Sequence, residues 1–351
     1  MSASSESAAP RTVLVTWVDF PGEDSPEVRR LQEVGLELRR APRLRDRSVD
    51  EVIRLARGCE AAIVSTDPFP REFFEAVPEM RVISRVGVGS DSIDLKAAEE
   101  HGVAVAIARG TNEEAVADHT IGLMLAVLRK IPAMDASVRH EEWRRTEPWL
   151  GSDLHGKTVG LLGLGRIARL VAERLAGFGV QIIGYDPYAV PPPAVRAADF
   201  DEVISGADIL SLHLPLTPET RGCIGRDEIA RMRPGAILIN TSRGGVVDEA
   251  VLSEALREGR ITGAGLDVFS EEPPVHSPLL GLTRSTVLTP HIGGLSREAI
   301  VDMVAHATDA VVDVMNGRKP RDVVNSPHPP PWEAGLLARA DSGGHTERNE
   351  S

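Results

Sequence analysis

Cysteine and long apolar runs are both scarce in this sequence. Its two cysteines, Cys59 and Cys223, lack the spacing of a metal site or of a disulfide framework. This usage fits a reducing compartment, so we expect a cytoplasmic protein without bound metal. No segment approaches the run of about 18 apolar residues that a membrane span needs. Residues 1–10 are rich in Ser and Ala and lack the apolar core of a signal peptide, so we expect no leader.

Positive charge is also in deficit. The chain has 39 Lys and Arg against 52 Asp and Glu, which gives a formal net charge of -13. This balance argues against binding to nucleic acid or to anionic membranes through the whole surface. An anionic substrate would therefore need a local concentration of cations.

The length of 351 residues exceeds the usual size of one hydrophobic core, so we expect two domains. In the N-terminal third, short apolar segments alternate with helical ones, which predicts an α/β domain with a doubly wound parallel sheet. A longer helix should run from Glu113 to about Lys130, before Pro132 interrupts it. The predicted strands are Thr12–Val18, Ala61–Val64, Val82–Arg85 and Val103–Ala106, and the predicted helices are Glu27–Gly35 and Asp50–Ala56.

The alternation restarts at Thr158 and predicts a second doubly wound parallel sheet. An amphipathic helix, Glu298–Met315, should follow with Ser296 as its N-cap. After Asn325 the composition turns to proline and polar residues, which predicts a disordered tail. The predicted strands of this part are Thr158–Leu162, Gln181–Tyr185, Ala207–Leu214, Ala236–Asn240, Gly263–Asp267 and Thr286–Leu288.

A glycine loop stands between the first strand and the first helix of the second sheet. It reads Gly163-Leu164-Gly165-Arg166-Ile167-Ala168, and such a pattern is weak without its strand–loop–helix context. Gly163 would allow the tight turn, and Gly165 would let a pyrophosphate approach the helix N-terminus, where the N–H groups lack partners. The pattern in this context predicts a dinucleotide site.

Asp186 indicates which dinucleotide is bound. It follows the next predicted strand, 23 residues after Gly163 (186 − 163), where a carboxylate can accept hydrogen bonds from the adenosine ribose. The same carboxylate would repel a 2′-phosphate, and the following Pro187-Tyr188 offers no arginine to attract one. We therefore predict NAD rather than NADP.

Three charged residues that follow later strands fit hydride chemistry on a 2-keto acid. Arg243 could hold a substrate carboxylate with its two-point guanidinium fork. His291 could transfer the proton, since its charge changes near neutral pH. Glu272 could stabilise the imidazolium and hold one tautomer. Each residue alone has an ordinary interpretation as an ion pair, a turn or a loop histidine, so the prediction depends on their combination in one glycine-loop domain.

Longer stretches of the sequence resemble the D-isomer-specific 2-hydroxyacid dehydrogenase family, and within it the short form of D-3-phosphoglycerate dehydrogenase. The resemblance extends from about Thr12 to Asn325. The matching stretches are Arg85–Asp91, Ala115–Thr120, Gly156–Gly160, the glycine loop, Ser242–Gly244, Asp267–Phe269 and Pro290–Gly294.

The resemblance implies an NAD domain, residues 112–296, inserted in a flavodoxin-like substrate domain, residues 12–111 and 297–326. Residues 1–11 and 327–351 are then expected to be disordered ends. It also implies Arg243, Glu272 and His291 as the catalytic residues, and a homodimer formed by the NAD domains. The cofactor-binding residues would be Gly163, Gly165, Arg166, Ile167, Asp186, His213, Pro215, Thr220, Thr241, Asp267, His291 and Gly293, and the substrate-binding residues Arg85, Val86, Gly87, Val88, Gly89, Arg109, Asn112 and Arg243.

The sequence departs from the phosphoglycerate dehydrogenase pattern in two loops. Where those relatives carry a phosphate-binding arginine, this chain has Ser65-Thr66-Asp67, and Arg109 replaces a common proline. Our hypothesis is that Arg85 and Arg109 read a second anionic group in a different position, such as a phosphonate, a phosphate or a carboxylate. The alternative is a small substrate such as glyoxylate or hydroxypyruvate, with Arg109 in solvent.

Two other functions occur on this scaffold. Phosphite oxidation is disfavoured, because the relatives that carry it out have a lysine where this chain has Val88. An NAD-sensing protein that resembles the C-terminal-binding corepressors is a further alternative, although the intact catalytic residues give no reason to prefer it.

Overall fold

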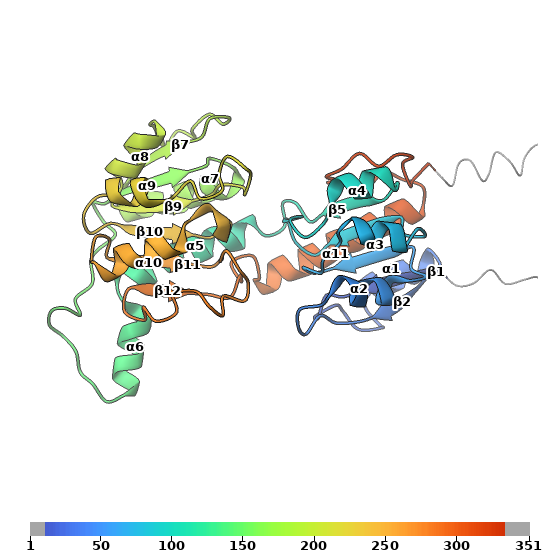
Figure 1. The fold of residues 1–351 in the computed structure, drawn as a ribbon, viewed down its shortest axis with the longest axis horizontal. Coiled ribbons are helices and arrows are strands. Elements are labelled where there is room, and N and C mark those ends of the chain that lie inside the picture. The colour runs from blue at the N-terminus through green and yellow to red at the C-terminus, as the bar shows by residue number, and fades with distance from the viewer. Residues whose placement is uncertain (1–10, 334–351) are drawn as a thin grey trace, which may run out of the picture. The chain divides into compact units, whose positions relative to one another are not determined.

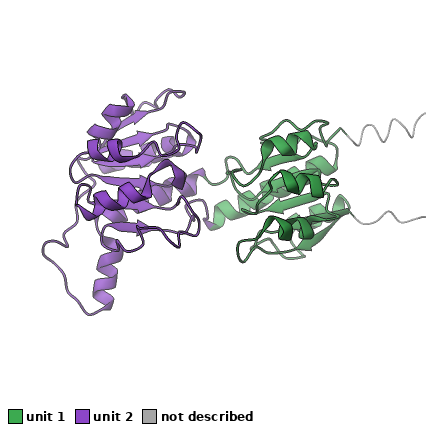
Figure 2. Cartoon of the chain, viewed as in Figure 1, with its two compact units in different colours: residues 1–112, 297–351 green, residues 113–296 purple. Residues whose placement is uncertain are grey.

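The computed structural model describes residues 11–333, which form two compact units (Figures 1 and 2). Unit 1 takes the described residues up to Asn112 and from Arg297 onward, and unit 2 takes Glu113–Ser296. Each unit is built on its own parallel sheet, so the predicted α/β class with two doubly wound sheets is confirmed. Within residues 11–333, no helix has the length and apolar character needed to cross a membrane.

Unit 1 has a five-stranded sheet in the flavodoxin-like order β2-β1-β3-β4-β5, with every neighbouring pair parallel. β3 and β5 are buried along their whole length, because the four residues of each strand are apolar and both faces of the sheet are covered. The strands are β1 Arg11–Val15, β2 Leu36–Arg40, β3 Ala61–Val64, β4 Val82–Arg85 and β5 Ala104–Ile107. The helices between them are α1 Pro26–Glu33, α2 Val49–Ala56, α3 Arg71–Ala76 and α4 Leu95–Glu100.

The last helix, α11 (Arg297–Met315), returns to unit 1 and packs on β3, β4 and β5. After it, the chain runs antiparallel along the free edge of β5, where Val324 N donates to Val105 O (2.9 Å). Residues 327–333 were expected in a disordered tail, but they pack on this unit: Arg81 donates to Pro331 O (2.6 Å). Arg11, expected in the disordered start, begins β1. The remainder of both expected disordered ends lies outside the described residues.

Unit 2 has a seven-stranded sheet in the order β12-β11-β10-β9-β6-β7-β8, again with parallel pairs throughout. Its order reverses between β6 and β9, which makes the carboxyl ends of these strands the switch point where ligands bind in such sheets. The strands are β6 Thr158–Leu162, β7 Gln181–Tyr185, β8 Arg196–Ala197, β9 Ile209–Leu212, β10 Ile237–Asn240, β11 Gly263–Leu266 and β12 Thr286–Leu288.

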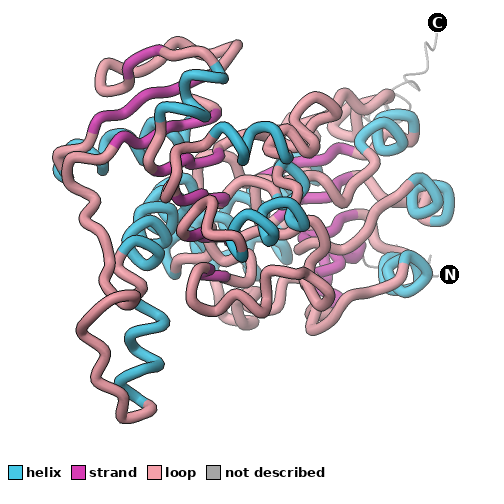
Figure 3. Tube along the Cα trace, turned by 60° about the vertical axis from the view of Figure 1, so that its left-hand side comes forward, coloured by secondary structure: helices cyan, strands magenta, loops and turns pink. Residues whose placement is uncertain are grey.

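Helix α5 (Glu113–Leu128) packs on β10, β11 and β12, and half of its residues are buried. Its acidic start suits the helix dipole. The break expected at Pro132 is present, since α5 ends at Leu128 and a new helix begins at Ile131. Figure 3 shows this second helix and the loop after it extending away from the rest of unit 2. The other helices of unit 2 are α6 Ile131–Arg139, α7 Arg166–Leu175, α8 Phe200–Gly206, α9 Arg226–Arg231 and α10 Glu249–Arg257, with short 3-10 turns at Ala176–Phe178 and Gly244–Val246.

Candidate active site

The glycine loop joins the end of β6 to the start of α7. Gly163 has φ 87°, and a Cβ atom there would lie 2.5 Å from His213 O, so both its conformation and its surroundings require glycine. Gly165 is the N-cap of α7, and a Cβ atom there would meet nothing within 4 Å. The N-terminus of α7 is thus open beside Arg166 and Ile167, whereas Ala168 is buried. This arrangement can accept a pyrophosphate at the helix N-terminus.

Asp186 lies directly after β7 and turns back toward the glycine loop. Its Oδ2 accepts a hydrogen bond from Leu164 N (2.8 Å), and its Oδ1 accepts one from Tyr188 N (2.8 Å). The carboxylate is therefore fixed next to the loop, and its role toward a ribose stays a prediction.

The loop after β9 carries His213, Pro215 and Thr220. His213 Nε2 lies 3.0 Å from Ser211 Oγ, and burial lowers the pKa of His213 to about 4. The ring is consequently neutral at physiological pH. The Thr220 hydroxyl donates to Pro215 O (2.6 Å), which closes the turn.

The loop after β10 carries Thr241 and Arg243. The side chain of Asn240 holds it, since Nδ2 donates to Arg243 O (2.9 Å). A Cβ atom on Gly244 would lie 1.8 Å from the Phe269 carbonyl carbon, so only glycine fits where this loop touches the one after β11. Arg243 therefore lies beside the segment that carries Glu272.

Asp267, the first residue after β11, organises the loop after β12. Its Oδ1 accepts hydrogen bonds from Thr289 Oγ1 (2.6 Å) and Ile292 N (2.9 Å), and its Oδ2 accepts one from Gly293 N (2.7 Å). Its backbone oxygen accepts one from His291 N (2.8 Å). Four contacts to one buried aspartate thus fix the segment from Thr289 to Gly293.

Glu272 and His291 form a hydrogen-bonded pair. Glu272 Oε2 lies 2.7 Å from His291 Nδ1, and Glu272 Oε1 accepts from Phe269 N (3.0 Å). His291 has φ 54°, a left-handed conformation that is uncommon for a side chain of this size. With Nδ1 directed at the carboxylate, Nε2 remains for proton transfer to a ligand.

Both carboxyl groups are kept ionised by their partners. Burial alone would raise the pKa of Glu272, but hydrogen bonds from His291 and Phe269 N outweigh it, and the net effect lowers the pKa. Burial opposes ionisation of Asp267 in the same way, and hydrogen bonds from His119, Thr289 and two backbone N–H groups lower its pKa overall. The loop after β11 therefore holds two negative charges, and the loop after β12 places His291 against both of them.

The residues predicted to bind substrate in unit 1 belong to the loops after β4 and β5. Arg85 ends β4 and donates to Ser65 O (2.5 Å), while Val86 N donates to Val64 O (2.9 Å). Gly87, Val88 and Gly89 continue the loop, and Gly87 O accepts from Ala108 N (2.9 Å). Arg109 lies with its Nε 3.6 Å from Asp322 Oδ1 and its side chain 46% exposed. Asn112 is the last residue before unit 2 begins.

Asp67 changes the interpretation of the loop after β3. In the sequence, this acid stands in the loop where the phosphoglycerate dehydrogenase relatives carry a phosphate-binding arginine. In the structure its side chain is fully buried, accepts from the Thr16 hydroxyl (2.5 Å), and pairs with Arg47 (3.0 Å). Arg47 has only 7% of its side chain exposed. Asp67 is therefore a structural partner of Arg47, and its charge gives no indication of which substrate is bound.

Sequence reasoning assigned no role to three residues that the structure brings to this site: His119, Thr120 and Thr289. His119 Nε2 lies 2.9 Å from Thr289 Oγ1, and Thr120 Oγ1 lies 2.8 Å from Thr241 Oγ1. The signal available in the sequence was that His119 and Thr120 belong to one of the stretches with family resemblance. Their partners are more than a hundred residues away in sequence, so spacing could not reveal these contacts.

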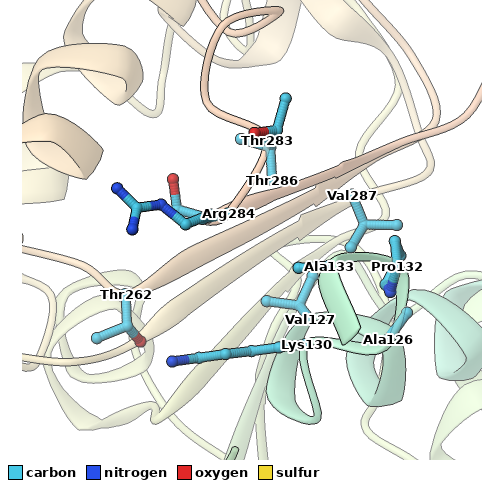
Figure 4. Close-up of a pocket in the computed structure, with 11 residues that line it drawn as sticks. Ala126, Val127, Lys130, Pro132, Ala133, Thr262, Thr283, Arg284, Thr286 and Val287 are labelled. Carbon is cyan, nitrogen blue, oxygen red and sulfur yellow. The ribbon is translucent and has the colours of Figure 1, made fainter. Parts of the chain in front are cut away.

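A cavity of about 20 Å³ lies at the β12 edge of unit 2, away from these groups (Figure 4). Lys130, Thr262 and Arg284 are among the residues that line it. It contains none of the glycine-loop residues and neither member of the His–Glu pair, so it is not the candidate active site.

An open helix N-terminus after a glycine loop, together with a His–Glu pair and an arginine on neighbouring loops, is typical of a dinucleotide-dependent oxidoreductase. Residues 121–293 match the family description "D-isomer specific 2-hydroxyacid dehydrogenase, NAD binding domain". The glyoxylate reductase of Thermococcus litoralis is 39% identical over 301 residues, which cover 83% of this chain and 90% of that protein. The chain belongs to the D-isomer-specific 2-hydroxyacid dehydrogenase family, so the expected family is confirmed.

Two further relatives differ in how much of their length is matched. The D-3-phosphoglycerate dehydrogenase of Mycobacterium bovis is 40% identical over 281 residues, which cover 79% of this chain and 53% of that protein. This chain thus spans about half the length of that relative. The crystal structure of the TT0316 protein from Thermus thermophilus matches with a TM-score of 0.82 at 38% identity, over 89% of this chain and 99% of that one.

Proposed function

We propose that this chain is an NAD-linked oxidoreductase that interconverts a 2-keto acid and its (R)-2-hydroxy acid. The observation that carries the proposal is the 2.7 Å contact between Glu272 Oε2 and His291 Nδ1 at the carboxyl edge of the domain that matches the family's NAD-binding part. This contact supplies an imidazole with a fixed orientation and a negative charge behind it, which is what proton transfer to a developing alkoxide requires.

Three side chains divide the work on the substrate. Arg243 binds the carboxylate through its guanidinium fork and polarises the adjacent ketone. In the direction of reduction, C2 would accept the hydride that NADH supplies, and His291 Nε2 would give its proton to the carbonyl oxygen, so that the ketone becomes an alcohol. Glu272 stabilises the imidazolium before the transfer and keeps Nδ1 as the protonated nitrogen after it.

NAD fits the residues around the glycine loop. When bound, it supplies or accepts the hydride. The open N-terminus of α7 at Gly165 would receive the pyrophosphate, and Asp186 would face the adenosine ribose. His213, Pro215 and Thr220 would lie beside the adenosine, and Thr241, Asp267 and Gly293 beside the nicotinamide. The carboxylate of Asp186 favours NAD over NADP by repelling a 2′-phosphate.

For the substrate, we propose a 2-keto acid with a second anionic group that Arg85 and Arg109 recognise. The N–H groups of the loop after Val86, whose own N–H donates to Val64 O, would add donors for the carboxylate, and so would the side chain of Asn112. Arg109 supports this proposal in part, since almost half of its side chain is exposed and its Nε lies 3.6 Å from Asp322, beyond hydrogen-bond distance.

The second candidate is reduction of a small keto acid such as glyoxylate or hydroxypyruvate. It is supported by the same Arg109–Asp322 ion pair, which leaves less positive charge for a ligand. It is also supported by the Thermococcus relative, whose name is glyoxylate reductase and which this chain matches over 90% of its length.

The test is NADH oxidation with a panel of 2-keto acids that differ in the distal group: none, hydroxyl, carboxylate, phosphate or phosphonate. We expect turnover with NADH and much weaker turnover with NADPH, and the highest kcat/KM for a member with a distal anion. If glyoxylate or hydroxypyruvate is preferred, the second candidate replaces the first. If NADH binds but no keto acid is reduced, the proposal fails in favour of a binding function.

We also propose a cytoplasmic homodimer formed through unit 2. The support is an apolar surface on α6 and the loop after it, where Ile131 (52%), Val138 (57%) and Trp143 (76%) are exposed. Light scattering should give twice the chain mass for the wild type. Val138→Glu should then yield the monomer, while Glu141→Gln, on the same exposed segment, should leave the dimer intact.

A further inference from the structure

His119 stands out because it contacts the loop of the catalytic histidine from a helix with no other assigned role. It lies on α5, with 22% of its side chain exposed. Its Nε2 is 2.9 Å from Thr289 Oγ1 and 3.4 Å from Asp267 Oδ1. Thr289 and Asp267 are the two residues at which the strands β12 and β11 pass into the active-site loops.

The positions of the hydrogen atoms in this contact follow from what each group can donate. Asp267 is an ionised carboxylate and can only accept, so the Thr289 hydroxyl must give its single hydrogen to Asp267 Oδ1 across 2.6 Å. The Thr289 oxygen then has only lone pairs to offer His119. The hydrogen in the 2.9 Å contact must therefore belong to His119 Nε2, which fixes the tautomer of this ring.

Thr120, the next residue on α5, acts in the same way on the neighbouring loop. Its hydroxyl donates to Val116 O (2.7 Å), so in the 2.8 Å contact the hydrogen comes from Thr241 Oγ1. Two consecutive residues of one helix thus orient hydroxyl groups in the loops after β10 and β12, on either side of Asp267.

The loop after β12, which His119 contacts through Thr289, contains a residue in an uncommon backbone conformation. His291 has φ 54°, and such a conformation persists in a side chain of this kind only where surrounding contacts determine it. Those contacts converge on Asp267, and the Thr289 hydroxyl is one of them. Without a donor at position 119, that hydroxyl could rotate away from Asp267, and the loop would lose one of its restraints.

We propose that His119 is a positioning residue for proton transfer: its Nε2–H orients the Thr289 hydroxyl toward Asp267 and so fixes the loop that carries His291. This role is additional to the three side chains that act on the substrate, and it rests on the proposed function. It needs only an N–H donor at this point, so an amide that places an N–H group there can replace the ring.

The test compares two substitutions at one position. His119→Ala should lower kcat by about tenfold, since a buried hydrogen bond is lost and His291 is misplaced. The KM for the keto acid and the Kd for NADH should each change by less than about threefold. His119→Gln, whose amide nitrogen lies near the position of Nε2, should restore kcat to within about threefold of the wild type. His101→Gln, on an exposed histidine at the end of α4, is the matched control and should leave all three constants unchanged.

Equal loss of kcat in His119→Ala and His119→Gln would overturn the proposal, and so would a loss confined to NADH binding. The pair can be tested further with Thr289→Val. The double variant His119→Ala/Thr289→Val should be no slower than Thr289→Val alone, because both changes remove the same restraint. Additive losses would contradict this.

A measurement on the unmodified chain separates this proposal from the proposed function. Nitrogen-15 NMR of labelled histidine should report a hydrogen on His119 Nε2, whichever keto acid is turned over. The opposite tautomer would overturn the positioning role even if the enzyme reduces keto acids. If NMR finds the hydrogen on His119 Nε2 but the protein reduces no keto acid, the His119–Thr289 contact stands and only the proposed reaction is refuted.

Discussion

The two units have the same kind of sheet but use its carboxyl edge differently. In unit 2 the loops after β10, β11 and β12 hold one another through side chains, and Glu272 and His291 remain available beside Arg243. In unit 1, Asp67 and Arg85 at the same edge are engaged within the protein. Asp67 is buried against Arg47 and Thr16, and Arg85 donates to Ser65 O.

The difference shows that topology alone does not specify chemistry. Both edges are places where ligands can bind in an open parallel sheet. At the edge of unit 2, a titratable pair is held with one nitrogen of the imidazole left for a ligand. A charged side chain at the carboxyl edge of a sheet can act on a ligand when its protein partners orient it and still leave it able to interact. Four substitutions test this difference between the units.

The largest effect is expected at His291, whose Nε2 is proposed to transfer the proton. His291→Asn should lower kcat by about a thousandfold, because proton transfer to the alkoxide loses its donor. Asparagine tolerates the left-handed conformation of this position, so the loop should be retained. Steady-state kinetics should show the loss, while NADH titration by fluorescence should give an unchanged Kd. A parallel loss of NADH binding would mean that His291 shapes the cofactor site and does not act on the substrate.

Removal of the buried cation Arg47 in unit 1 should lower the stability of the fold and leave the rate of turnover unchanged. Arg47→Met removes the nearest cation from the buried Asp67 charge and leaves only Arg43 Nε at 3.9 Å, so the free energy of unfolding should fall by about 3 kcal/mol. Arg45→Met, in an exposed pair with Glu51 (side chain of Arg45 70% exposed), should cost less than about 1 kcal/mol. Urea denaturation measures both. If Arg47→Met changed substrate selectivity at unchanged stability, the Arg47–Asp67 pair would belong to a binding site and the contrast would be lost.

Much of both sheets could be predicted from the sequence. β3, β4, β6, β7 and β12 have the predicted bounds, since short apolar runs between turns are typical of buried parallel strands. The edge strand β2 was missed because Glu37, Arg39 and Arg40 hide its pattern. The packing of residues 327–333 was also missed, because proline-rich composition predicts disorder and cannot reveal a contact with Arg81.

The candidate site divides in the same way. Arg243, Glu272 and His291 could be found because each follows a strand and carries a charge. The buried pair of Asp67 with Arg47 and the contact of His119 with Thr289 could not be found, because they join residues 20 and 170 positions apart. Such contacts depend on which strands become neighbours in the sheet. The local pattern of apolar residues predicts where a strand lies in the sequence but not which strand lies beside it.

A smaller effect should come from His213, the half-buried histidine in the loop after β9. The folded protein holds the pKa of His213 at about 4, against an ordinary value of 6.5. Because this folded value is depressed, the unfolded chain takes up a proton below pH 6.5 that the folded chain refuses. Stability should therefore fall as the pH drops from 6.5 toward 4, with a slope of up to about 1.4 kcal/mol per pH unit from this group. His213→Gln should flatten the slope in urea unfolding, and His140→Gln, on an exposed histidine, should not. Identical slopes in all three proteins would show that His213 is not buried as described.

The smallest effect is expected for the partly exposed cation of unit 1. Arg109→Ala should lower kcat/KM by only about threefold to tenfold for keto acids with a distal anion, since an exposed guanidinium contributes little. The value for glyoxylate should not change. Arg57→Ala, at the C-cap of α2, is the control. If kcat/KM stays constant for every keto acid, Arg109 serves only its ion pair with Asp322, and the small-substrate alternative gains support.

The central claim is that unit 2 carries out hydride and proton transfer at C2 of a hydroxy acid with one handedness. The most direct measurement is NAD reduction with the separate enantiomers of each 2-hydroxy acid whose keto form is turned over. NADH should form with the (R)-enantiomer and not with the (S)-enantiomer, and the signal should be lost in His291→Asn. Equal rates with both enantiomers, or a signal that survives the substitution, would contradict it.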